Sequence, residues 1–297
     1  MRCETVLPPL PREAVARARP GSYTRCGGGA AATNTGGRMA DRTRLAILVS
    51  TTERAQAAAE VLVASRAWVP LEQASAVVVV GGDGFMLQTL HQMLDHGPLI
   101  PAYGINLGTV GFLMNKPRSS RPIGERVARA RAFDVAPLIM TATTGSGAQQ
   151  TFCAINEISL LRETRQTAKL EVTVDGKLRI PELACDGVLV ATPAGSTAYN
   201  LSANGPILPL GSAMLALTPI SPFRPRRWRG AILPDSSRIG FRVLEADKRP
   251  VAAVADQREV REIAEVSVAV AAEQRLTLLF DRGHALDERI VTEQFQT

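Results

Sequence analysis

The sequence lacks the features that mark several large protein classes. No apolar run approaches the ~20 residues that a membrane span requires, and the longest candidates, such as Ala76–Val80, suit a buried strand. Aromatic residues make up only 4% of the chain, so its core must be built from Val, Leu, Ile and Ala. With 45% apolar and 21% charged residues, the composition is that of a globular protein, neither disordered nor fibrous.

Cysteine is scarce and scattered. The four cysteines form no close pair and no spacing typical of a zinc site. Cys153 and Cys185 lie in apolar segments, so we expect buried free thiols in a reducing compartment. The N-terminal region also lacks the apolar core of ~7–15 residues found in a secretory signal. We therefore expect a cytoplasmic protein with no membrane partner.

The positive charge is concentrated near the N-terminus. Residues 1–38 hold six Arg and two Glu, a balance of +4, which leaves only +2 of the total +6 for the rest. That is too little for a nucleic-acid footprint, so no nucleic-acid partner is expected. The basic stretch 222–230 admits contact with cofactor phosphates or nucleic acid, but we favour a loop that packs on a neighbouring subunit.

Residues 1–38 differ from the remainder in composition. They include Pro-Pro-Leu-Pro, Gly-Gly-Gly and Thr-Asn-Thr-Gly-Gly, and they show no sustained helical or strand period. Two interpretations remain, a disordered extension or a misassigned start. We favour the second, with Met39 as the true beginning of the chain.

From Arg44 to about residue 135 the pattern predicts an α/β domain. Strands that alternate with helices, and a strand that is apolar on both faces, are typical of a covered parallel sheet. The expected strands and helices, in chain order, are Leu45–Val49, Thr52–Ser65 (helix), Ala76–Val80, Phe85–Leu94 (helix) and Leu99–Asn106.

After about residue 135 the period changes to two, which predicts an antiparallel β domain. Leu170, Val172 and Val174 alternate with polar residues, and Asp175-Gly176 then supplies a two-residue hairpin turn. Further alternating sets are Ile239, Phe241, Val243 and Val266, Val268, Val270.

The first candidate site is Gly81-Gly82-Asp83-Gly84, which follows a buried strand and precedes a helix. Backbone N–H groups at a helix N-terminus bind anions, and glycine lets a phosphate approach closely. Asp83 is well placed there to take a proton or to hold a metal. The alternative is a tight turn without chemistry.

A second glycine loop, Gly104 to Leu113, follows the next strand. Gly104, Gly108 and Gly111 are spaced G-x-x-x-G-x-x-G, which is not the dinucleotide fingerprint, and no P-loop occurs in the chain. Because loops at the carboxyl ends of strands line the ligand crevice of an open α/β sheet, phosphates bound here would use a different cradle.

Asn156-Glu157 is the third candidate. An amide that donates and accepts, beside a carboxylate that accepts, suits sugar hydroxyls and a base edge. The alternative is an ordinary turn or an exposed strand end.

The fourth candidate runs from Asp186 to Ser202. A strand ends at Thr192, and a loop of small residues leads into an expected helix with Ser196 or Thr197 as its N-cap. Small side chains leave room for a flat ring, and the hydroxyls can bond to its edge. Ser196 is not in a G-x-S-x-G elbow and none of the three histidines is near it in sequence, which argues against a hydrolase.

These four blocks, in this order and spacing, resemble the NAD kinase family. Its Gly-Gly-Asp-Gly appears at 81–84, its Asn-Glu/Asp pair at 156–157, and its Asp-Gly…Thr-Pro-x-Gly-Ser-Thr-Ala-Tyr block begins at Asp186. The resemblance covers roughly residues 44–280. Gly-Gly-Asp-Gly alone also fits lipid kinases and phosphofructokinases, which lack the last block.

The resemblance implies a role for each candidate. Asp83 would be the general base that takes the proton from the ribose 2′-hydroxyl, with Gly84 beside it. Asn156 and Glu157 would hold the adenosine ribose and adenine of NAD, and Asp186 would contact this dinucleotide across the domain interface. The other NAD-binding positions would be Ala194, Thr197, Ala198, Tyr199, Asn200, Leu201 and Ser202. The ATP phosphate loops would comprise Gly81, Gly82, Gly84, Gly108 and Gly111.

The implied activity is phosphorylation of the 2′-hydroxyl of the adenosine ribose of NAD by ATP and a divalent metal, Mg²⁺, to give NADP. Such catalysis is mainly positioning and charge neutralisation. No metal ligand is assigned. Two alternatives stay open, polyphosphate in place of ATP as the phosphoryl donor and NADH in place of NAD as the acceptor. Expected partners are the small-molecule substrates and further copies of the chain, in a homodimer or homotetramer.

The implied fold is that of NAD and diacylglycerol kinases, with the active site between two domains. A Rossmann-like α/β domain would span 39–135, an antiparallel β-sandwich 136–275, and a C-terminal segment, 276–297, would pack back on the first domain. A lipid or diacylglycerol-type kinase is one alternative, but the polar block 192–202 argues against a greasy groove. A non-catalytic dinucleotide-binding regulator is the other.

Overall fold

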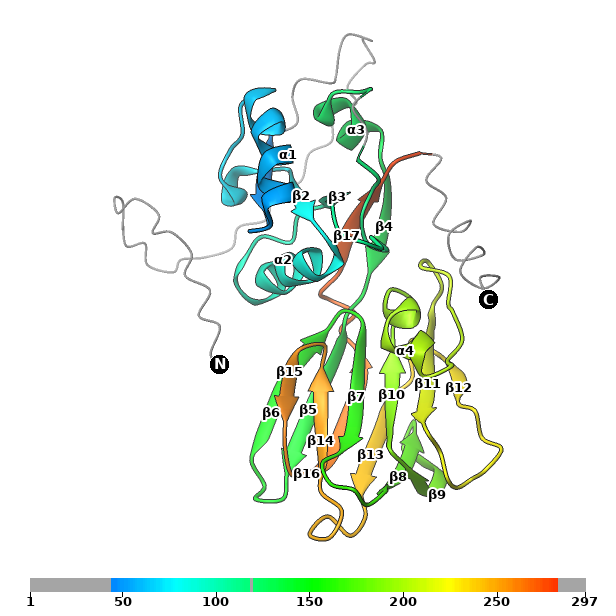
Figure 1. Cartoon of the computed structure of the whole chain (residues 1–297). Coiled ribbons are helices and arrows are strands. Elements are labelled where there is room, and N and C mark those ends of the chain that lie inside the picture. The colour runs from blue at the N-terminus through cyan, green and yellow to red at the C-terminus, as the bar shows by residue number, and fades with distance from the viewer. Residues whose placement is uncertain (1–43, 118–119, 283–297) are drawn as a thin grey trace, which may run out of the picture. The chain divides into compact units, whose positions relative to one another are not determined.

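A computed structural model describes residues 44–117 and 120–282 (Figure 1). The expectations for residues 1–38, and for 276–297 from residue 283 onward, lie outside these described residues. In the described part, strands first alternate with helices and antiparallel strands then follow. The predicted fold class, an α/β part followed by an all-β part, is confirmed.

The α/β part contains one five-stranded sheet. Its strands are β1 Leu45–Val49, β2 Ala76–Gly81, β3 Ala102–Asn106, β4 Arg131–Val135 and β17 Leu276–Phe280. Their order is β1-β2-β3-β17-β4, in which only β4 runs antiparallel to its neighbour. The predicted strand 99–106 is shorter than expected, because Pro101 has no N–H to give to a sheet ladder.

Helices cover both faces of this sheet (Figure 1). They are α1 Glu53–Ala64, α2 Asp83–His96 and α3 Ile123–Arg129. Val77 and Val79 of β2 share a buried cluster with Leu90 of α2, whereas Val78 and Val80 share another with residues of α1 and α3. The strand is therefore buried on both faces, which explains its uninterrupted apolar sequence.

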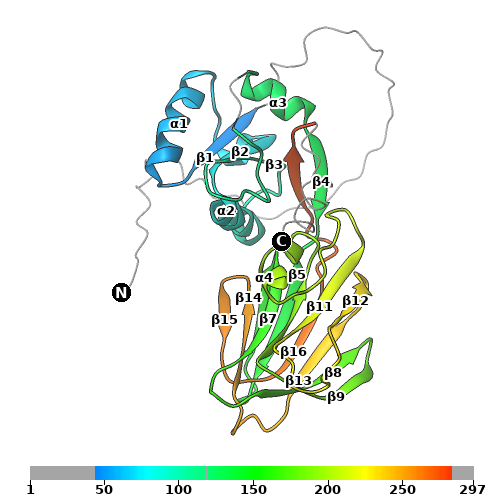
Figure 2. The same ribbon diagram turned by 45° about the vertical axis from the view of Figure 1, so that its right-hand side comes forward.

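The β part is a sandwich of two six-stranded antiparallel sheets, stacked face to face in Figure 2. The strands of one sheet are β5 Leu138–Thr144, β6 Gln149–Ala154, β8 Ala168–Val174, β9 Lys177–Cys185, β13 Ile239–Val243 and β16 Ile263–Val270. Those of the other are β7 Glu157–Arg162, β10 Gly187–Ala191, β11 Met214–Ile220, β12 Ala231–Pro234, β14 Val251–Ala255 and β15 Arg258–Val260. The orders are β6-β5-β16-β13-β8-β9 and β12-β11-β10-β7-β14-β15.

The sandwich core follows the alternation seen in the sequence. Val172 and Phe241 from one sheet and Leu160 and Val190 from the other lie in a single buried cluster. The predicted hairpin turn also forms, since Asp175 and Gly176 join β8 to β9 with φ of +52° and +70°. Positive φ at both positions is the geometry that matches the twist of a two-residue hairpin.

The chain passes between the two parts twice. β4 ends at Val135 and β5 begins at Leu138, while β16 ends at Val270 and β17 begins at Leu276. Strand β17 then lies between β3 and β4 in the α/β sheet (Figure 1). The α/β sheet is thus completed by a strand that reaches it only after the whole sandwich.

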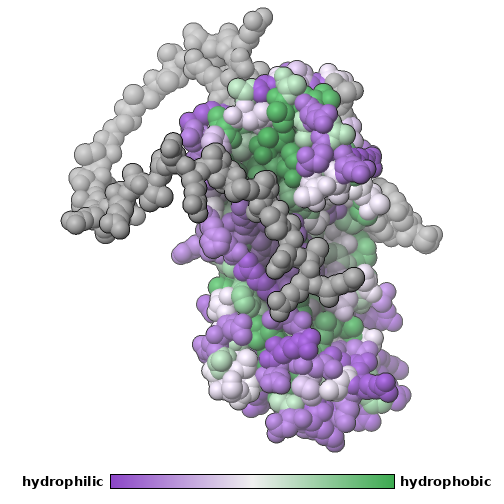
Figure 3. Space-filling view, turned by 60° about the vertical axis from the view of Figure 1, so that its left-hand side comes forward, coloured by the Kyte–Doolittle hydropathy of each residue, from purple (hydrophilic) through white to green (hydrophobic). Residues whose placement is uncertain are grey.

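The surface is mixed in character. Figure 3 shows a strip of hydrophobic residues on one face of the α/β part, set among hydrophilic ones. Val61 and Val63 of α1 are among the exposed large hydrophobic residues of the described part. No helix within the described residues is both long enough and apolar enough to cross a membrane.

Candidate functional site

The two predicted glycine loops lie against each other. β2 ends in Gly81 and its neighbour β3 ends in Asn106, and the loops that follow meet at Gly82 and Gly108. A Cβ on Gly108 would lie 3.2 Å from the Gly82 Cα, which is tighter than most real contacts. A Cβ on Gly84 would meet nothing within 4 Å. Bare backbone therefore shapes this carboxyl edge of the sheet, with open space beside Gly84, as a phosphate site requires.

Asp83 begins α2 and uses its carboxylate to hold the second glycine loop. Its Oδ2 accepts hydrogen bonds from the N–H groups of Gly111 at 2.7 Å and Phe112 at 3.0 Å. Its Oδ1 accepts one from the Leu113 N–H at 2.8 Å. Since a carboxylate offers about four acceptor sites, one on Oδ1 is left for another group.

Gly111 is required at its position for two reasons. Its φ is +77°, and a Cβ there would lie 2.2 Å from Nδ2 of Asn106. The loop thus closes tightly onto Asp83, and the Gly111 N–H donates to that carboxylate. Of the predicted phosphate-loop glycines, Gly111 therefore serves first to shape the surroundings of Asp83.

The third and fourth candidates are interlocked. Thr192 donates its hydroxyl to the Ile155 carbonyl at 2.7 Å, and its N–H bonds to the Asn156 carbonyl at 2.9 Å. A Cβ on Gly195 would lie 2.1 Å from that same Asn156 carbonyl oxygen, so only glycine fits. The start of β7, with Asn156 and Glu157, and the loop after β10 therefore form one structure, as the predicted NAD pocket requires.

The expected helix after Gly195 is replaced by two short turns, a 3-10 helix Gly195–Thr197 and α4 Tyr199–Ser202. The expectation that Ser196 or Thr197 is an N-cap is wrong, since neither helix has a side-chain cap. Ser196 is fully buried and donates its hydroxyl to the Pro193 carbonyl at 2.7 Å. It also accepts a hydrogen bond from the Leu208 N–H at 3.0 Å. Its hydroxyl therefore bonds to Pro193 and Leu208 and does not cap a helix.

Asn200 is committed to the protein itself. Its amide donates to the carbonyls of Ser196 at 3.0 Å and Pro206 at 2.9 Å, and its oxygen accepts the Thr218 hydroxyl at 2.7 Å. The residue is fully buried. Its side chain therefore fixes the shape of the loop. Thr197, Ala198, Tyr199 and Leu201 are half-buried and Ser202 is exposed.

Glu157 is the unusual carboxyl of the site. Its Oε2 is buried and accepts no hydrogen bond from any described residue. Burial, and secondly the nearby Asp256 carboxylate, raise the pKa of Glu157 to about 7, against a smaller lowering by a hydrogen bond from the Tyr199 backbone. A buried acceptor without a partner is costly in a folded protein unless a ligand supplies the missing donor.

Two residues at this site were missed by sequence reasoning. Asp256, in the turn between β14 and β15, accepts hydrogen bonds from the N–H groups of Ile155, Asn156 and Glu157. His91 of α2 contacts the same carboxylate at 2.7 Å. Asp256 follows Asn156 by 100 residues, and no sequence motif signals the pairing.

Asp186 lies at the other end of β10 from Glu157. It is nearer to Tyr199, since burial and then the charges of Glu157 and Asp186 raise the pKa of that phenol. It precedes β10, whose Gly187 pairs with Leu161 and whose Ala191 pairs with Glu157. About four residues of strand, roughly 13 Å, therefore separate its end of the sheet from Glu157. Asp186 pairs there with Arg162 at 2.6 Å, and its N–H bonds to Ile220, just before the basic stretch 222–230.

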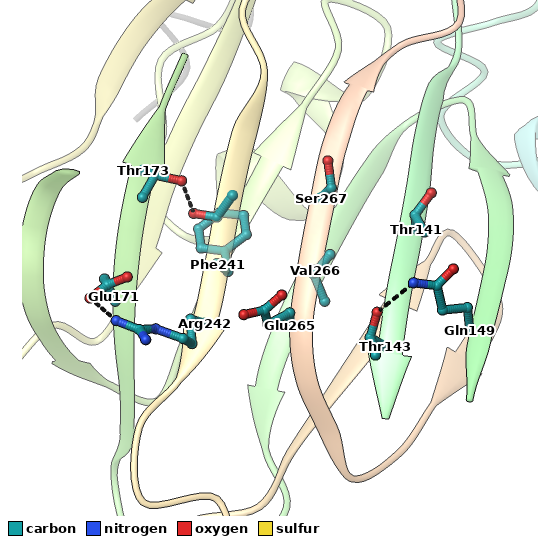
Figure 4. A pocket seen from close by; sticks show the side chains of 11 residues that line it. Thr141, Thr143, Gln149, Glu171, Thr173, Phe241, Arg242, Glu265, Val266 and Ser267 are labelled. Carbon is teal, nitrogen blue, oxygen red and sulfur yellow. Dashed lines mark hydrogen bonds and ion pairs between the residues drawn. The ribbon is translucent and has the colours of Figure 1, made fainter. Parts of the chain in front are cut away.

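One cavity of about 550 Å³ lies on the outer face of the β6-β5-β16-β13-β8-β9 sheet and contains none of the candidate residues (Figure 4). Its side chains pair with each other, as Arg242 does with Glu171. A smaller cavity, of about 230 Å³, is lined by Pro193 and Ala194 together with Val135 and Leu210. The smaller cavity therefore borders the predicted NAD pocket.

The described residues contain no group of three or more His, Cys, Asp or Glu side chains that could hold a metal ion. Cys153 and Cys185 are free thiols, and Cys185 is buried as expected whereas Cys153 is half-buried. Burial raises the pKa of Cys185 to about 12, which makes it an unreactive thiol.

The buried Glu157 predicts an unusual dependence of stability on pH. Its folded pKa of about 7 exceeds the value of 4.5 for a free carboxyl, so the folded state binds more protons between these values. The free energy of unfolding should therefore fall as pH rises from 4.5 to 7, by up to about 3 kcal/mol. Glu157→Gln should remove this slope in urea unfolding of ligand-free protein, whereas the exposed control Glu273→Gln should keep it. Parallel profiles for all three proteins would contradict the assignment.

The chain is similar to known proteins in both sequence and fold. Residues 155–279 match the family described as the ATP-NAD kinase C-terminal domain. In fold, the chain is similar to a yeast NADH kinase solved with NADH, with TM-score 0.67 and 26% identity over 77% of this chain and 70% of that one. It is similar, at 24% identity and TM-score 0.67, to an Archaeoglobus fulgidus NAD kinase solved with ATP, over 84% and 98% of the two chains.

Closer relatives share most of the sequence. The chain is 60% identical to the NAD kinase of Zymomonas mobilis over 253 residues, which are 85% of this chain and 98% of the relative. It is 61% identical to the NAD kinase of Rhizorhabdus wittichii over 252 residues, with the same coverage. Identity at this level over nearly the whole of each relative shows that the chain belongs to the NAD kinase family.

Proposed function

We propose that Asp83 is the general base of the NAD kinase reaction, in which ATP phosphorylates NAD to give NADP. It would take the proton from the 2′-hydroxyl of the adenosine ribose as that oxygen attacks the terminal phosphorus of ATP. The observation that carries this role is the Asp83 carboxylate, held by three backbone N–H groups with one acceptor site on Oδ1 remaining. It stands between two glycine loops where phosphates can approach.

The acceptor half of the site would be formed by the start of β7 and the loop after β10. Asn156 and Glu157 would hold the ribose and adenine of NAD. The Glu157 Oε2, which has no hydrogen-bond partner among the described residues, would accept a hydrogen bond from the adenine ring. Ala194 borders a cavity beside them. Thr197, Ala198, Tyr199, Leu201 and Ser202 would line the pocket, with Asn200 as its buried support.

The donor half would be the bare backbone around Gly81, Gly82, Gly84 and Gly108, against which the ATP phosphates would lie. We propose that Mg²⁺ enters bound to these phosphates. Magnesium commonly takes one or two carboxylates plus substrate phosphates, and the described residues offer no preformed three-ligand cluster. The ion would neutralise the charge that develops on the transferred group.

We further propose a homodimer or homotetramer in which Asp186 reaches NAD bound to a neighbouring copy. Within one chain it lies at the far end of β10 from Glu157. The same end carries the basic stretch 222–230, where Phe223 is 53% exposed and Arg224 bonds to Ala184. An exposed aromatic ring with two arginines, Arg224 and Arg226, stacked against it suits a protein interface. The 39–135 domain would supply the half of the site that binds ATP, and the 136–275 domain the half that binds NAD.

A cytoplasmic setting is also part of the proposal, and the free thiols of Cys153 and Cys185 support it.

The chemistry can be tested by a panel of substrates with purified protein. NAD, ATP and Mg²⁺ should yield NADP with the phosphate on the 2′-oxygen, identified by ³¹P NMR. Polyphosphate and NADH in the same panel define donor and acceptor range. Phosphorylation of diacylglycerol, or NAD binding without turnover, would favour a lipid kinase or a dinucleotide-binding regulator instead.

Asp83→Asn should lower kcat by ~10²–10⁴, the usual effect of losing a positioned base. Asparagine also turns an NH₂ group toward one of the N–H donors, so some loss comes from a loosened loop. Gly111→Ala separates the two effects, because it disrupts the loop and keeps the carboxylate. The base role predicts a much larger loss of kcat for Asp83→Asn. Equal losses, with equal falls in melting temperature, would reduce Asp83 to a loop anchor.

Asn156→Ala should weaken NAD binding by ~1–3 kcal/mol, because groups of the ribose lose their partner. ATP binding should change much less, since the proposed ATP-binding loops follow β2 and β3, whereas Asn156 precedes β7. Isothermal titration with each nucleotide gives both values, and Gln149→Ala, on the outer sheet face, is the control. A similar loss for both nucleotides would indicate general damage instead of a lost NAD contact.

A further inference from the structure

We infer that Asp256 is a positioning residue for the reaction, one that ties the helix of Asp83 to the strand start that carries Asn156 and Glu157. The inference rests on the proposed function. Asp256 occupies the turn between β14 and β15 with φ of +52°, a conformation that Asp adopts more readily than most residues. Its side chain is 1% exposed.

Asp256 gathers the backbone at the beginning of β7. Its Oδ1 accepts the N–H groups of Asn156 at 3.0 Å and Glu157 at 3.2 Å, and its Oδ2 accepts that of Ile155 at 2.6 Å. In return, its own N–H donates to the Glu157 carbonyl at 3.1 Å. The backbone of both predicted NAD-binding residues is therefore fixed by one side chain.

The fourth bond to Asp256 comes from α2. His91 Nε2 lies 2.7 Å from Oδ2, and because a carboxylate only accepts, this nitrogen carries the proton. His91 follows Asp83 by eight residues on the same helix, a rise of about 12 Å. The helix that begins with the proposed base is thus bonded, two turns later, to the carboxylate that fixes the acceptor site.

Simple packing would not need such a group. Ile155 already shares an apolar cluster with Met86 and Leu90 of α2, so the two elements are in contact without Asp256. A fully buried carboxylate is costly unless all its acceptor sites are used. What four directional bonds add is a defined register between α2 and β7. A displacement of about 1 Å between a general base, here Asp83, and the hydroxyl that it deprotonates can lower the rate by about 10²-fold.

A second pair joins α2 to the same β14–β15 hairpin and provides a matched control. Asp95, four residues after His91 on α2, forms an ion pair with Arg258, two residues after Asp256. Both side chains are about one-third exposed, at 31% and 37%, and in the described part of the chain no hydrogen bond joins Arg258 to the 155–157 backbone. Loss of this pair would weaken the same contact without disturbing the acceptor strand.

The test compares His91→Leu, His91→Gln and Asp95→Asn with wild type in steady-state kinetics and thermal unfolding. His91→Leu should lower kcat by roughly 10- to 100-fold, with the KM for ATP near wild type. Its melting temperature should also fall, because the buried Asp256 carboxylate loses one of its four donors. His91→Gln, whose amide can donate to Asp256, should recover most of that loss. Asp95→Asn should stay within about twofold of wild type in kcat.

Asp256→Asn adds a readout that general loosening would not move. It should lower kcat and raise the KM for NAD, and because it removes a charge that raises the pKa of Glu157, the pH midpoint of NAD binding should move down. If Asp256→Asn fails to fold, the His91 series decides alone. His91→Ala, which also lacks a donor, replaces His91→Leu if the leucine variant misfolds.

The inference is overturned if His91→Leu keeps wild-type kcat, if His91→Gln gives no recovery, or if Asp95→Asn loses as much as His91→Leu. These results are distinct from a failure of the proposed function. In that case wild-type protein would form no NADP, or Asp83→Asn would turn over normally, whatever the His91 variants do.

Discussion

Within residues 44–117 and 120–282, a carboxylate that accepts three successive backbone N–H groups from a distant segment occurs twice, and the candidate site is organised around these two carboxylates. Asp83 receives Gly111, Phe112 and Leu113. Asp256 receives the N–H groups of residues 155–157. Charge-assisted bonds of this kind are shorter and roughly twice as strong as neutral ones, so each carboxylate can hold the backbone of its loop in one conformation. Helix α2 connects them, with Asp83 at its start and His91 bonded to Asp256.

The two carboxylates differ in how completely they are used. All four acceptor sites of the Asp256 carboxylate are filled by N–H donors, and its side chain is buried, as expected of a residue that only positions others. Asp83 is half-buried at the positive end of the α2 dipole and keeps one site free beside the glycine loops. A group that must exchange a proton needs that free site and access to substrate. The contrast agrees with a catalytic role for one carboxylate and a supporting role for the other.

Much of the fold could be predicted because its signals are local. The apolar run of β2 and the Asp175-Gly176 turn each depend on a few neighbouring residues. The loops at Gly82 and Gly108 could be placed together because they follow parallel strands. The role of Ser196 could not be predicted, since its hydroxyl has partners at Pro193 and Leu208 that outcompete a helix cap. Asp256 escaped prediction because its partners lie far away in the sequence, at 99 to 101 residues for the 155–157 backbone and 165 for His91.

Glu157 lowers the stability of the folded chain at the candidate site. Its Oε2 is buried without a partner beside a second carboxylate, an arrangement that lowers the stability of the folded chain at neutral pH. Surrounding structure holds it there, since Asp256 fixes its N–H and Gly195 packs on the preceding carbonyl. Folded proteins keep such a conflict where a ligand resolves it. A donor from the adenine of NAD would satisfy Oε2 and favour the ionised carboxyl. Because the same Asp256 both fixes Glu157 and helps to raise its pKa, one side chain would then influence both NAD binding and the alignment of α2.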